Sequence, residues 1–235
     1  KSANKKLPPE EQKQYDEIVE RINFLCTLAY QNKVKLLIDA EETWIQDAVD
    51  EIVYKNAEEF NRDEIIIYNT IQLYRKGRIK EINKQIDLAR KFGYKIGFKL
   101  VRGAYMEKEA KRAHQMSYPN PIQDTKKDSD NDYNQALKIC FENRDIVAVM
   151  AGTHNEESSL LLAELIENNN ISKSDDRFWF AQLYGMSDHI SYNLANKGFN
   201  VAKYLPYGPV KEVLPYLSRR AQENSSVKGQ SSREL

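Results

Sequence analysis

Short apolar segments alternate with amphipathic segments along most of the chain, and this alternation limits the possible folds more than any other feature. The apolar segments are interpreted as buried strands because they are short and bounded by turn residues. A regular strand–helix alternation with apolar strands predicts a parallel sheet covered by helices. The predicted strands span residues 34–39, 64–69, 95–101, 146–150, 178–183 and 200–204.

The segments between these strands place apolar residues three and four positions apart, which predicts amphipathic helices. The first helix is expected to follow Pro8 and Pro9, since proline suits a helix entrance, and Gly93 is expected to close the third helix. Residues 118–130, rich in Pro, Asn and Asp, are interpreted as a loop, and residues 225–235 as a polar tail. The expected helices lie near 15–29, 44–53, 79–92, 107–115, 133–141, 156–167 and 188–197, and from Pro209 onward.

A parallel α/β sheet is either open and doubly wound or closed into a barrel. The glycine fingerprint of the dinucleotide-binding doubly wound fold follows none of the predicted strands, which favours the barrel. A closed barrel of this type has eight strands, and this sequence supplies six. We therefore expect a barrel whose first strands precede Lys1, with residues 1–224 forming the barrel and 225–235 the tail.

The composition excludes some classes of protein. Lys+Arg and Asp+Glu both number 35, so the formal net charge is zero, which disfavours sequence-independent nucleic-acid binding. The two cysteines, Cys26 and Cys140, fall on apolar helical faces and are interpreted as buried free thiols rather than a disulfide. No apolar run is long enough to span a bilayer.

Polar and aromatic residues gather where the predicted strands end. The carboxyl ends of barrel strands, with the loops that follow, carry the functional side chains of such folds. The segments in question are 39–42, 69–72, 99–105, 152–155, 182–186 and 204–209. They predict a site at one rim of the barrel, although strand ends are polar in many proteins without one.

Two charged clusters allow more than one interpretation. Asp39, Glu41 and Glu42 could hold a metal ion, but alternate strand residues face opposite ways, and such clusters are usually solvated or cap a helix. The three histidines are scattered, so no zinc pattern is present. Arg219 and Arg220 could clamp a carboxylate. Their spacing alone favours two solvated arginines, because adjacent helical residues diverge by about 100°.

Seven short segments, in order, resemble the proline dehydrogenase family, in particular its stand-alone type. The resemblance covers the chain from about residue 34 to residue 224. The matching segments are 38–42 (IDAEE), 68–74 (YNTIQLY), 99–105 (KLVRGAY), 153–155 (THN), 182–186 (QLYGM), 204–210 (YLPYGPV) and 213–224 (VLPYLSRRAQEN).

The resemblance implies a distorted (β/α)8 barrel of the TIM type, with FAD at the rim and the last helix over the barrel mouth. It implies oxidation of L-proline to 1-pyrroline-5-carboxylate, the first step of proline catabolism, by hydride transfer to FAD. Reduced flavin would pass its electrons to a quinone at a membrane surface. The expected location is the cytoplasm with peripheral membrane contact in a bacterium, or the mitochondrial matrix and inner membrane in a eukaryote.

Substrate-binding roles follow from the same resemblance. The family's arginine pair, matched by Arg219 and Arg220, binds the substrate carboxylate, so the clamp interpretation now prevails. Tyr105 and Tyr204 match tyrosines that pack against the substrate ring, and a tyrosine at the position of Tyr204 is typical of enzymes that prefer proline to hydroxyproline. Leu183 matches an apolar wall residue. Asp39, matched to a carboxylate in the substrate pocket, could alternatively cap the next helix, as Leu183 could be plain core.

Cofactor-binding roles are also implied by the resemblance. Lys99 would lie near the flavin N5, where many relatives have arginine, and a cation there stabilises negative charge on reduced flavin. Gly103 would admit close approach of the backbone to the cofactor. The matched flavin-contact positions are Gln72, Lys99, Val101, Gly103, Thr153 and His154.

Three other functions compete with this one. A flavin barrel enzyme similar to methylenetetrahydrofolate reductase would bind FAD but lack the arginine clamp. An incomplete barrel could act as a binding module without flavin, and a metal-dependent lyase could use Asp39. The family also has a lysine on its first barrel strand that helps to hold the substrate carboxylate, and no residue of this chain matches it.

Overall fold

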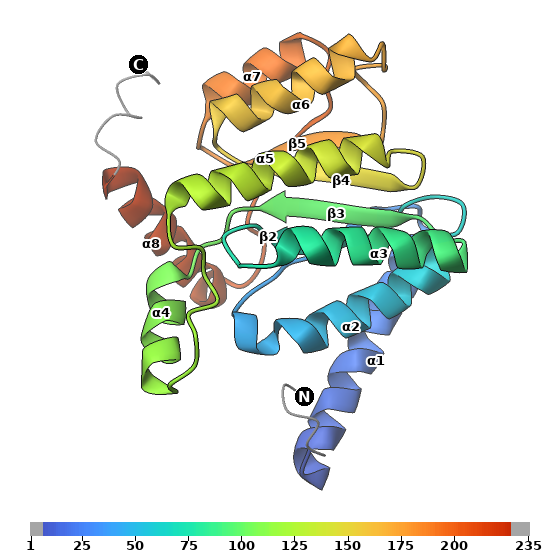
Figure 1. Ribbon diagram of the computed structural model, residues 1–235. Helices are drawn as coiled ribbons and strands as arrows, with labels where there is room; N and C mark the ends of the chain where they lie inside the picture. Colours follow the sequence, from blue (N-terminus) through green and yellow to red (C-terminus); the bar gives the residue numbers. More distant parts are fainter. Residues whose placement is uncertain (1–6, 227–235) are drawn as a thin grey trace.

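The computed structural model describes residues 7–226, with side chains described for residues 7–218. Six strands form one parallel sheet in which each strand pairs with the next along the chain (Figure 1). This arrangement confirms the predicted parallel α/β sheet. The strands are β1 Leu36–Ile38, β2 Ile67–Gln72, β3 Ile96–Val101, β4 Val147–Gly152, β5 Phe178–Leu183 and β6 Val201–Tyr204.

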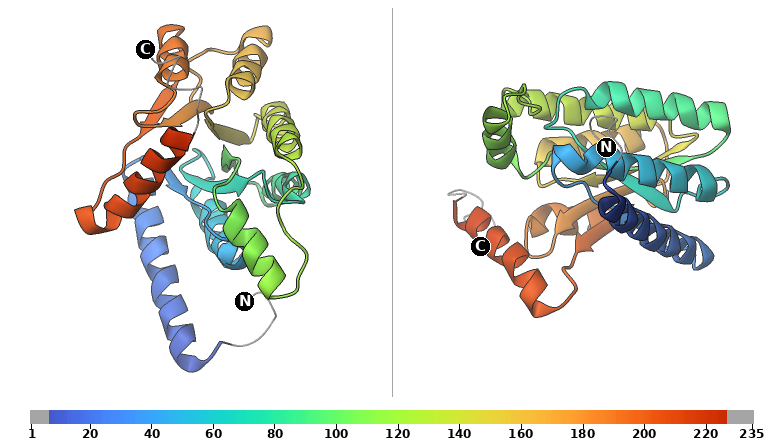
Figure 2. Two further views of the ribbon diagram at one scale, coloured as in Figure 1. Left: turned by 90° about the vertical axis from the view of Figure 1, so that its left-hand side faces the viewer. Right: turned by 90° about the horizontal axis from the view of Figure 1, so that it is seen from below.

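Helices cover the outer face of the sheet, and the sheet curls into a half-barrel (Figure 2). Figure 1 shows α2, α3 and α5 lying along this outer face, while α8 lies on the opposite side of the sheet in Figure 2. The helices are α1 Pro9–Gln31, α2 Thr43–Phe60, α3 Arg78–Phe92, α4 Met106–Gln115, α5 Lys126–Glu142, α6 Glu156–Asn168, α7 Asp188–Asn196 and α8 Val210–Ser226.

The boundaries of β2 differ from the prediction. The strand starts at Ile67 rather than residue 64 and continues beyond residue 69 to Gln72, so that Thr70 and Gln72 belong to the strand and not to the loop. Every residue of β2 is buried, including these polar ones. The prediction ended the strand too early because it treated polar residues as turn residues, whereas this part of the strand is the wall of a polar cavity.

The segment 118–130 was wrongly predicted as a loop over its whole length, because α5 begins at Lys126. The reason is a capping box, in which Thr125 accepts a hydrogen bond from the Asp128 backbone and the Asp128 carboxylate accepts one from the Thr125 backbone. At the chain's end, α8 runs to Ser226, so the first two residues of the expected tail are helical. Residues 227–235 lie outside the described residues.

The core lies between the outer face of the sheet and its helices. Its largest fully buried apolar side chains include Phe98, Phe178 and Phe180. Cys26 and Cys140 are buried free thiols, as predicted. Burial raises the pKa of Cys140 to about 12, so this thiol stays protonated and unreactive at neutral pH.

Candidate active site

A cavity of about 580 Å³ opens at the carboxyl ends of the strands. Its lining comes from residues at the ends of all six strands, from the loops that follow them, and from α8. Because parallel strands end at the same edge of a sheet, residues far apart in sequence meet here. The cavity brings together these sequence-predicted residues: Asp39, Gln72, Lys99, Val101, Gly103, Tyr105, Thr153, His154, Leu183 and Tyr204.

The predicted arginine clamp is not tested by this geometry. Arg219 and Arg220 belong to the helical span of α8, but their side chains lie outside the part of the chain that the structure describes. What is described is the preceding turn, where Tyr216 lines the cavity. The ring of Tyr216 meets the ring of Tyr204 edge to face, with centroids 5.8 Å apart. This contact attaches α8 to the end of β6.

Lys99 provides a positive charge inside the cavity. Its side chain is 18% exposed, and its Nζ lies 2.5 Å from Asp39 Oδ1. The same ammonium stands 5.9 Å from the centroid of the Tyr204 ring, within cation–π range. Thr70 donates a weaker hydrogen bond to Asp39 Oδ1 at 3.3 Å. Lys99 is therefore fixed between a carboxylate from the end of β1 and an aromatic ring from β6.

Gln72 lines the same cavity and contains an unpartnered buried acceptor. It is the last residue of β2, aligned with Val101 of β3, and is 4% exposed. Its Nε2 donates to the Glu41 carbonyl oxygen at 2.9 Å, while its Oε1 is buried and has no hydrogen-bond partner among the described residues. A buried acceptor without a partner costs free energy. The cavity therefore favours a ligand that carries an N–H or O–H donor near Gln72.

The structure gives a reason for the glycine at position 103 that the sequence did not reveal. The prediction assigned its lack of a side chain to the approach of a cofactor. Its φ is +128°, a backbone conformation that L side chains rarely adopt, and an added Cβ would lie 2.4 Å from the ring of Tyr74. The glycine is thus already required by the backbone turn after β3 and by the packing of Tyr74.

Arg102 links three elements beneath the cavity rim. Its guanidinium donates to Asp130 Oδ1 at 2.5 Å, to Thr153 Oγ1 at 2.7 Å and to Ser158 Oγ at 2.9 Å. The guanidinium also stacks over the buried Tyr133 ring, with 4.4 Å from Cζ to the centroid. The planar fork of arginine suits such a multiple contact. The ends of β3 and β4 are thereby connected to α5 and α6.

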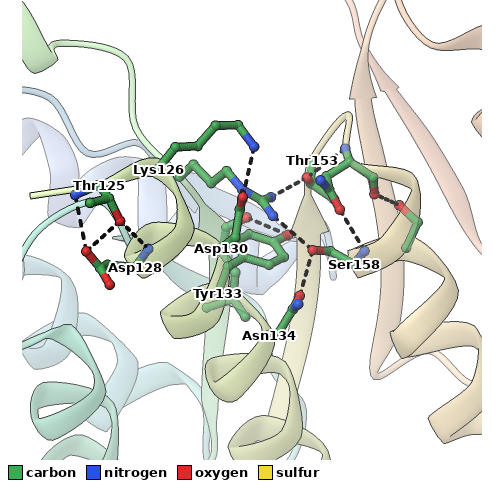
Figure 3. Close-up of polar contacts among 12 residues, drawn as sticks. Thr125, Lys126, Asp128, Asp130, Tyr133, Asn134, Thr153 and Ser158 are labelled. Carbon is green, nitrogen blue, oxygen red and sulfur yellow. Dashed lines mark hydrogen bonds and ion pairs between the residues drawn. The ribbon is translucent and has the colours of Figure 1, made fainter. Parts of the chain in front are cut away.

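Asp130 balances two cations at this place. Its Oδ1 accepts from Arg102 and its Oδ2 accepts from Lys126 at 2.8 Å (Figure 3). Burial alone would raise the pKa of Asp130, but the hydrogen bonds and charges of Lys126 and Arg102 outweigh it and hold the pKa below its ordinary value. Both cations also line the cavity, so two positive charges and one negative charge meet at this rim.

The segment Thr153-His154-Asn155 forms the turn between β4 and α6. The Asn155 side chain accepts a hydrogen bond from the Ser158 backbone at 2.8 Å and so caps α6. Thr153 Oγ1 accepts from the Asn155 backbone at 3.1 Å as well as from Arg102. His154 Nδ1 lies 2.9 Å from Ser187 Oγ. The turn is therefore hydrogen-bonded on one side to Arg102 of the β3 end and on the other to Ser187.

Sequence reasoning gave no role to several residues that build the site. Arg102, Lys126, Asp130 and Tyr216 all lie at the cavity or directly behind it. Arg102 stood inside a matching segment, and its charge at the end of an apolar strand was a usable signal. The sequence contained no comparable signal for Lys126 and Asp130, which had been assigned to a loop.

The acidic residues after β1 do not gather around one point as metal ligands would. Asp39 pairs with Lys99, the Glu41 carboxylate accepts from the Tyr105 hydroxyl, and Glu42 pairs with Lys108. Among residues 7–218, whose side chains are described, no group of three or more His, Cys, Asp or Glu side chains is arranged to hold a metal ion. Nor does any helix in this range have the length and apolar character needed to cross a membrane.

A curled parallel sheet with a cavity at its carboxyl ends defines the class of (β/α) barrel proteins that bind ligands at the strand ends. The solved structure of proline utilization A (PutA) from Bdellovibrio bacteriovorus, inactivated by N-propargylglycine, is similar in fold, with a TM-score of 0.83 at 25% identity. The similarity covers 92% of this chain and 22% of that one.

The chain belongs to the proline dehydrogenase family, whose sequence profile matches residues 1–233. Proline dehydrogenase 2, mitochondrial, from Arabidopsis thaliana is 42% identical over 226 residues, covering 94% of this chain and 48% of the relative. Proline dehydrogenase 1, mitochondrial, from Drosophila melanogaster is 35% identical over 231 residues, covering 94% of this chain and 34% of the relative. The chain thus spans a third to a half of these relatives.

Proposed function

We propose that this chain carries the FAD-dependent oxidation of L-proline to 1-pyrroline-5-carboxylate, the first step of proline catabolism. The observation that supports this most is the position of Lys99, a cation fixed by Asp39 and Tyr204 inside a cavity at the strand ends. The same cavity contains Tyr105 and Leu183, which supply aromatic and apolar walls for a small ring. Family membership gives the class of substrate.

The lining residues fit a flavin. Gln72 Oε1 is a buried acceptor that awaits a donor, and the isoalloxazine ring carries an N–H group among its carbonyls. Gln72, Val101, Gly103, Thr153 and His154 would hold the cofactor, and Lys99 would stabilise negative charge on its reduced ring. When bound, FAD supplies the acceptor for a hydride.

The protein's own residues would orient the substrate. Arg219 and Arg220 would bind the proline carboxylate through charge-assisted hydrogen bonds. Tyr105, Tyr204 and Leu183 would enclose the ring, and the bulk of Tyr204 would crowd an added hydroxyl. Oxidation removes a hydride from the ring carbon beside nitrogen and a proton from nitrogen, so the amine must be neutral. Orientation of the carboxylate by Arg219 and Arg220 would supply much of the rate.

The electrons would then leave the flavin for a quinone at a membrane surface. This part of the proposal rests on family membership alone. The chain's neutral charge, 35 basic against 35 acidic residues, gives no broad attraction to an anionic membrane. Docking would therefore depend on local surface residues or on a partner.

An anaerobic absorbance experiment tests the proposal. The flavin spectrum of the FAD-loaded protein should bleach on addition of L-proline. Arg219→Ala and Arg220→Ala variants should retain the flavin but bleach far more slowly, because they lack half of the carboxylate clamp. A wild-type flavin that does not bleach would point instead to a methylenetetrahydrofolate reductase-like enzyme, and absence of flavin binding would favour a binding module.

A further inference from the structure

Three consecutive residues after β1 each contact the region around α4, across 64 to 66 positions of sequence. The Glu41 carboxylate accepts from the Tyr105 hydroxyl, and Glu42 pairs with Lys108. Thr43 donates twice to the carboxylate of Glu109, through its backbone N–H and its hydroxyl, both at 2.7 Å. We call these three pairs the rim latch. It joins the loop after β1 to the loop after β3.

The Thr43–Glu109 pair is the buried part of the rim latch. Glu109 is 0% exposed and Thr43 is 9% exposed. By contrast, the Lys108 side chain is 55% exposed, so its pair with Glu42 is open to solvent and to salt. A buried carboxylate is stable only with its hydrogen bonds made, and Glu109 receives both from Thr43. The geometry of the latch therefore depends on this pair.

Glu109 also replaces a missing helix cap. The N-cap residue of α2, Glu42, makes no side-chain capping hydrogen bond, and the first turn of α2 contains no acidic residue. The carboxylate of Glu109 takes over this function from α4, where it also meets the favourable N-terminal dipole of α2. Because the capping carboxylate is on α4 and the capped N–H is on α2, a movement of either helix would break the cap. The start of α2 and the first turn of α4 are thus held in one arrangement.

This arrangement fixes two of the cavity's walls relative to each other. Asp39 lies four residues before Thr43, and Tyr105 lies four residues before Glu109. The Glu109 backbone N–H donates to the Tyr105 carbonyl at 2.9 Å, so Tyr105 is one helical turn from the buried carboxylate. α4 also contacts α2 through Trp44, whose ring centroid lies 4.4 Å from Arg112 Cζ and 5.6 Å from Lys108 Nζ. The position of Tyr105 therefore depends on the latch together with these ring contacts.

We infer that Glu109 and Thr43 are positioning residues that set the width of the substrate pocket between Asp39 and Tyr105. They touch neither substrate nor cofactor and act through Tyr105. This inference rests on the proposed function, since it assumes that a five-membered ring occupies the space beside Tyr105. The wall contacts the ring equally before and during the reaction, so its loss weakens binding rather than chemistry.

The test uses the FAD-loaded protein and two variants that weaken the pair. Thr43→Val removes the hydroxyl at nearly constant volume and leaves the backbone hydrogen bond to Glu109, and Glu109→Gln removes the charge. Each should raise the KM for L-proline about tenfold, the effect of one lost hydrogen bond to a charged group, with kcat within about threefold of wild type. Thr43→Ser, which keeps the hydroxyl, should restore the wild-type KM. Thr27→Val, a matched change in α1 where Thr27 bonds only its own helix at 2.8 Å, should leave KM unchanged.

Two competitive inhibitors distinguish a displaced Tyr105 wall from a general loss of order in the substrate pocket. Tetrahydrofuran-2-carboxylate has the proline ring with oxygen in place of nitrogen, and its inhibition constant should rise with KM in both variants. Acetate has a carboxylate but no ring, and its inhibition constant should stay within about twofold. Equal weakening of both inhibitors, or a lower melting temperature with no change in KM, would overturn the inference. If wild type itself is not bleached by proline, the proposed function fails first and the inference with it.

Discussion

Two lysines at opposite ends of the sheet have the same kinds of partner, a carboxylate and an aromatic ring. Lys99, at the carboxyl ends, pairs with Asp39 and stands over the Tyr204 ring. Lys35, at the amino ends, pairs with Asp176 and stands 5.6 Å from the centroid of the Trp179 ring. Their side chains are 18% and 23% exposed.

The difference lies in what surrounds each pair. Lys35 and Asp176 line a cavity of about 340 Å³ at the amino ends, where the buried Tyr68 hydroxyl has no hydrogen-bond partner among the described residues. Lys99 lines the cavity of about 580 Å³ at the carboxyl ends, together with the sequence-predicted residues Gln72, Tyr105 and Leu183. Because this fold binds its ligands at the carboxyl ends of the strands, only the Lys99 pair is expected to serve a ligand.

The largest expected effect comes from replacing Lys99 with methionine, and the same change at Lys35 is the control. Lys99→Met should slow reduction of the flavin by proline by about two to three orders of magnitude, because a preorganised charge at the reacting ring is lost. Lys35→Met, the matched change at the other end, should leave this rate unchanged. Anaerobic stopped-flow absorbance measures both. Equal slowing in the two variants would remove the functional distinction between the ends of the sheet.

A second comparison concerns two glycines with positive φ. Gly103→Ala should destabilise the fold by about 3 kcal/mol, because the added Cβ would lie 2.4 Å from the Tyr74 ring. Gly77→Ala, at φ +79° with open space around it, should cost only about 1 kcal/mol of backbone strain. Urea unfolding of the flavin-free variants gives both values. A Gly103 variant as stable as the Gly77 variant would return the explanation to the cofactor.

Substitution of Gln72 should have a smaller effect, on FAD binding more than on stability. Gln72→Leu should weaken FAD binding about tenfold, measured by flavin fluorescence, since one hydrogen bond to the ring is lost. The flavin-free protein should not lose stability in proportion, because the variant also removes an unpartnered buried acceptor. Gln85→Leu, in α3 and 6% exposed, is the control and should not change FAD binding. Unchanged FAD affinity in the Gln72 variant would contradict the assignment.

The smallest effect concerns pH and Asp130. The folded-state pKa of this carboxyl lies below its ordinary value of 3.8, so its pairing stabilises the protein above that pH and is lost as the pH falls through the folded-state pKa. Asp130→Asn should therefore be less stable than wild type at about pH 7 and approach wild type at about pH 3. Urea unfolding at the two pH values measures the difference. A difference that does not shrink in acid would show that Asp130 is not held ionised by Arg102 and Lys126.

The sequence predicted the order of strands and helices because each element has its own period of apolar residues. It also predicted a site at the strand ends, and the resemblance named residues that line one cavity. What it missed are contacts between elements. Arg102 reaches Asp130, Thr153 and Ser158 over 28 to 56 positions of sequence, and such contacts depend on strand register and helix phase.

Polarity misled the prediction at the site itself. Thr70 and Gln72 look like the start of a loop, yet they are buried strand residues whose partners come from other elements. At Gly103 the sequence suggested only the approach of a cofactor, which stays a prediction, whereas packing against Tyr74 already requires a glycine. In both cases the missing information was the identity of the neighbouring side chain.

The most direct test of the central claim is the stoichiometry of a single anaerobic turnover. FAD-loaded protein is mixed with excess L-proline, and the bleached flavin is compared with the 1-pyrroline-5-carboxylate formed, trapped as its coloured adduct with o-aminobenzaldehyde. The account predicts one product molecule for each flavin reduced, formed about two to three orders of magnitude more slowly by the Lys99→Met variant. Bleaching without this product, or product formed at an equal rate by the Lys99→Met variant, would contradict proline oxidation at this cavity.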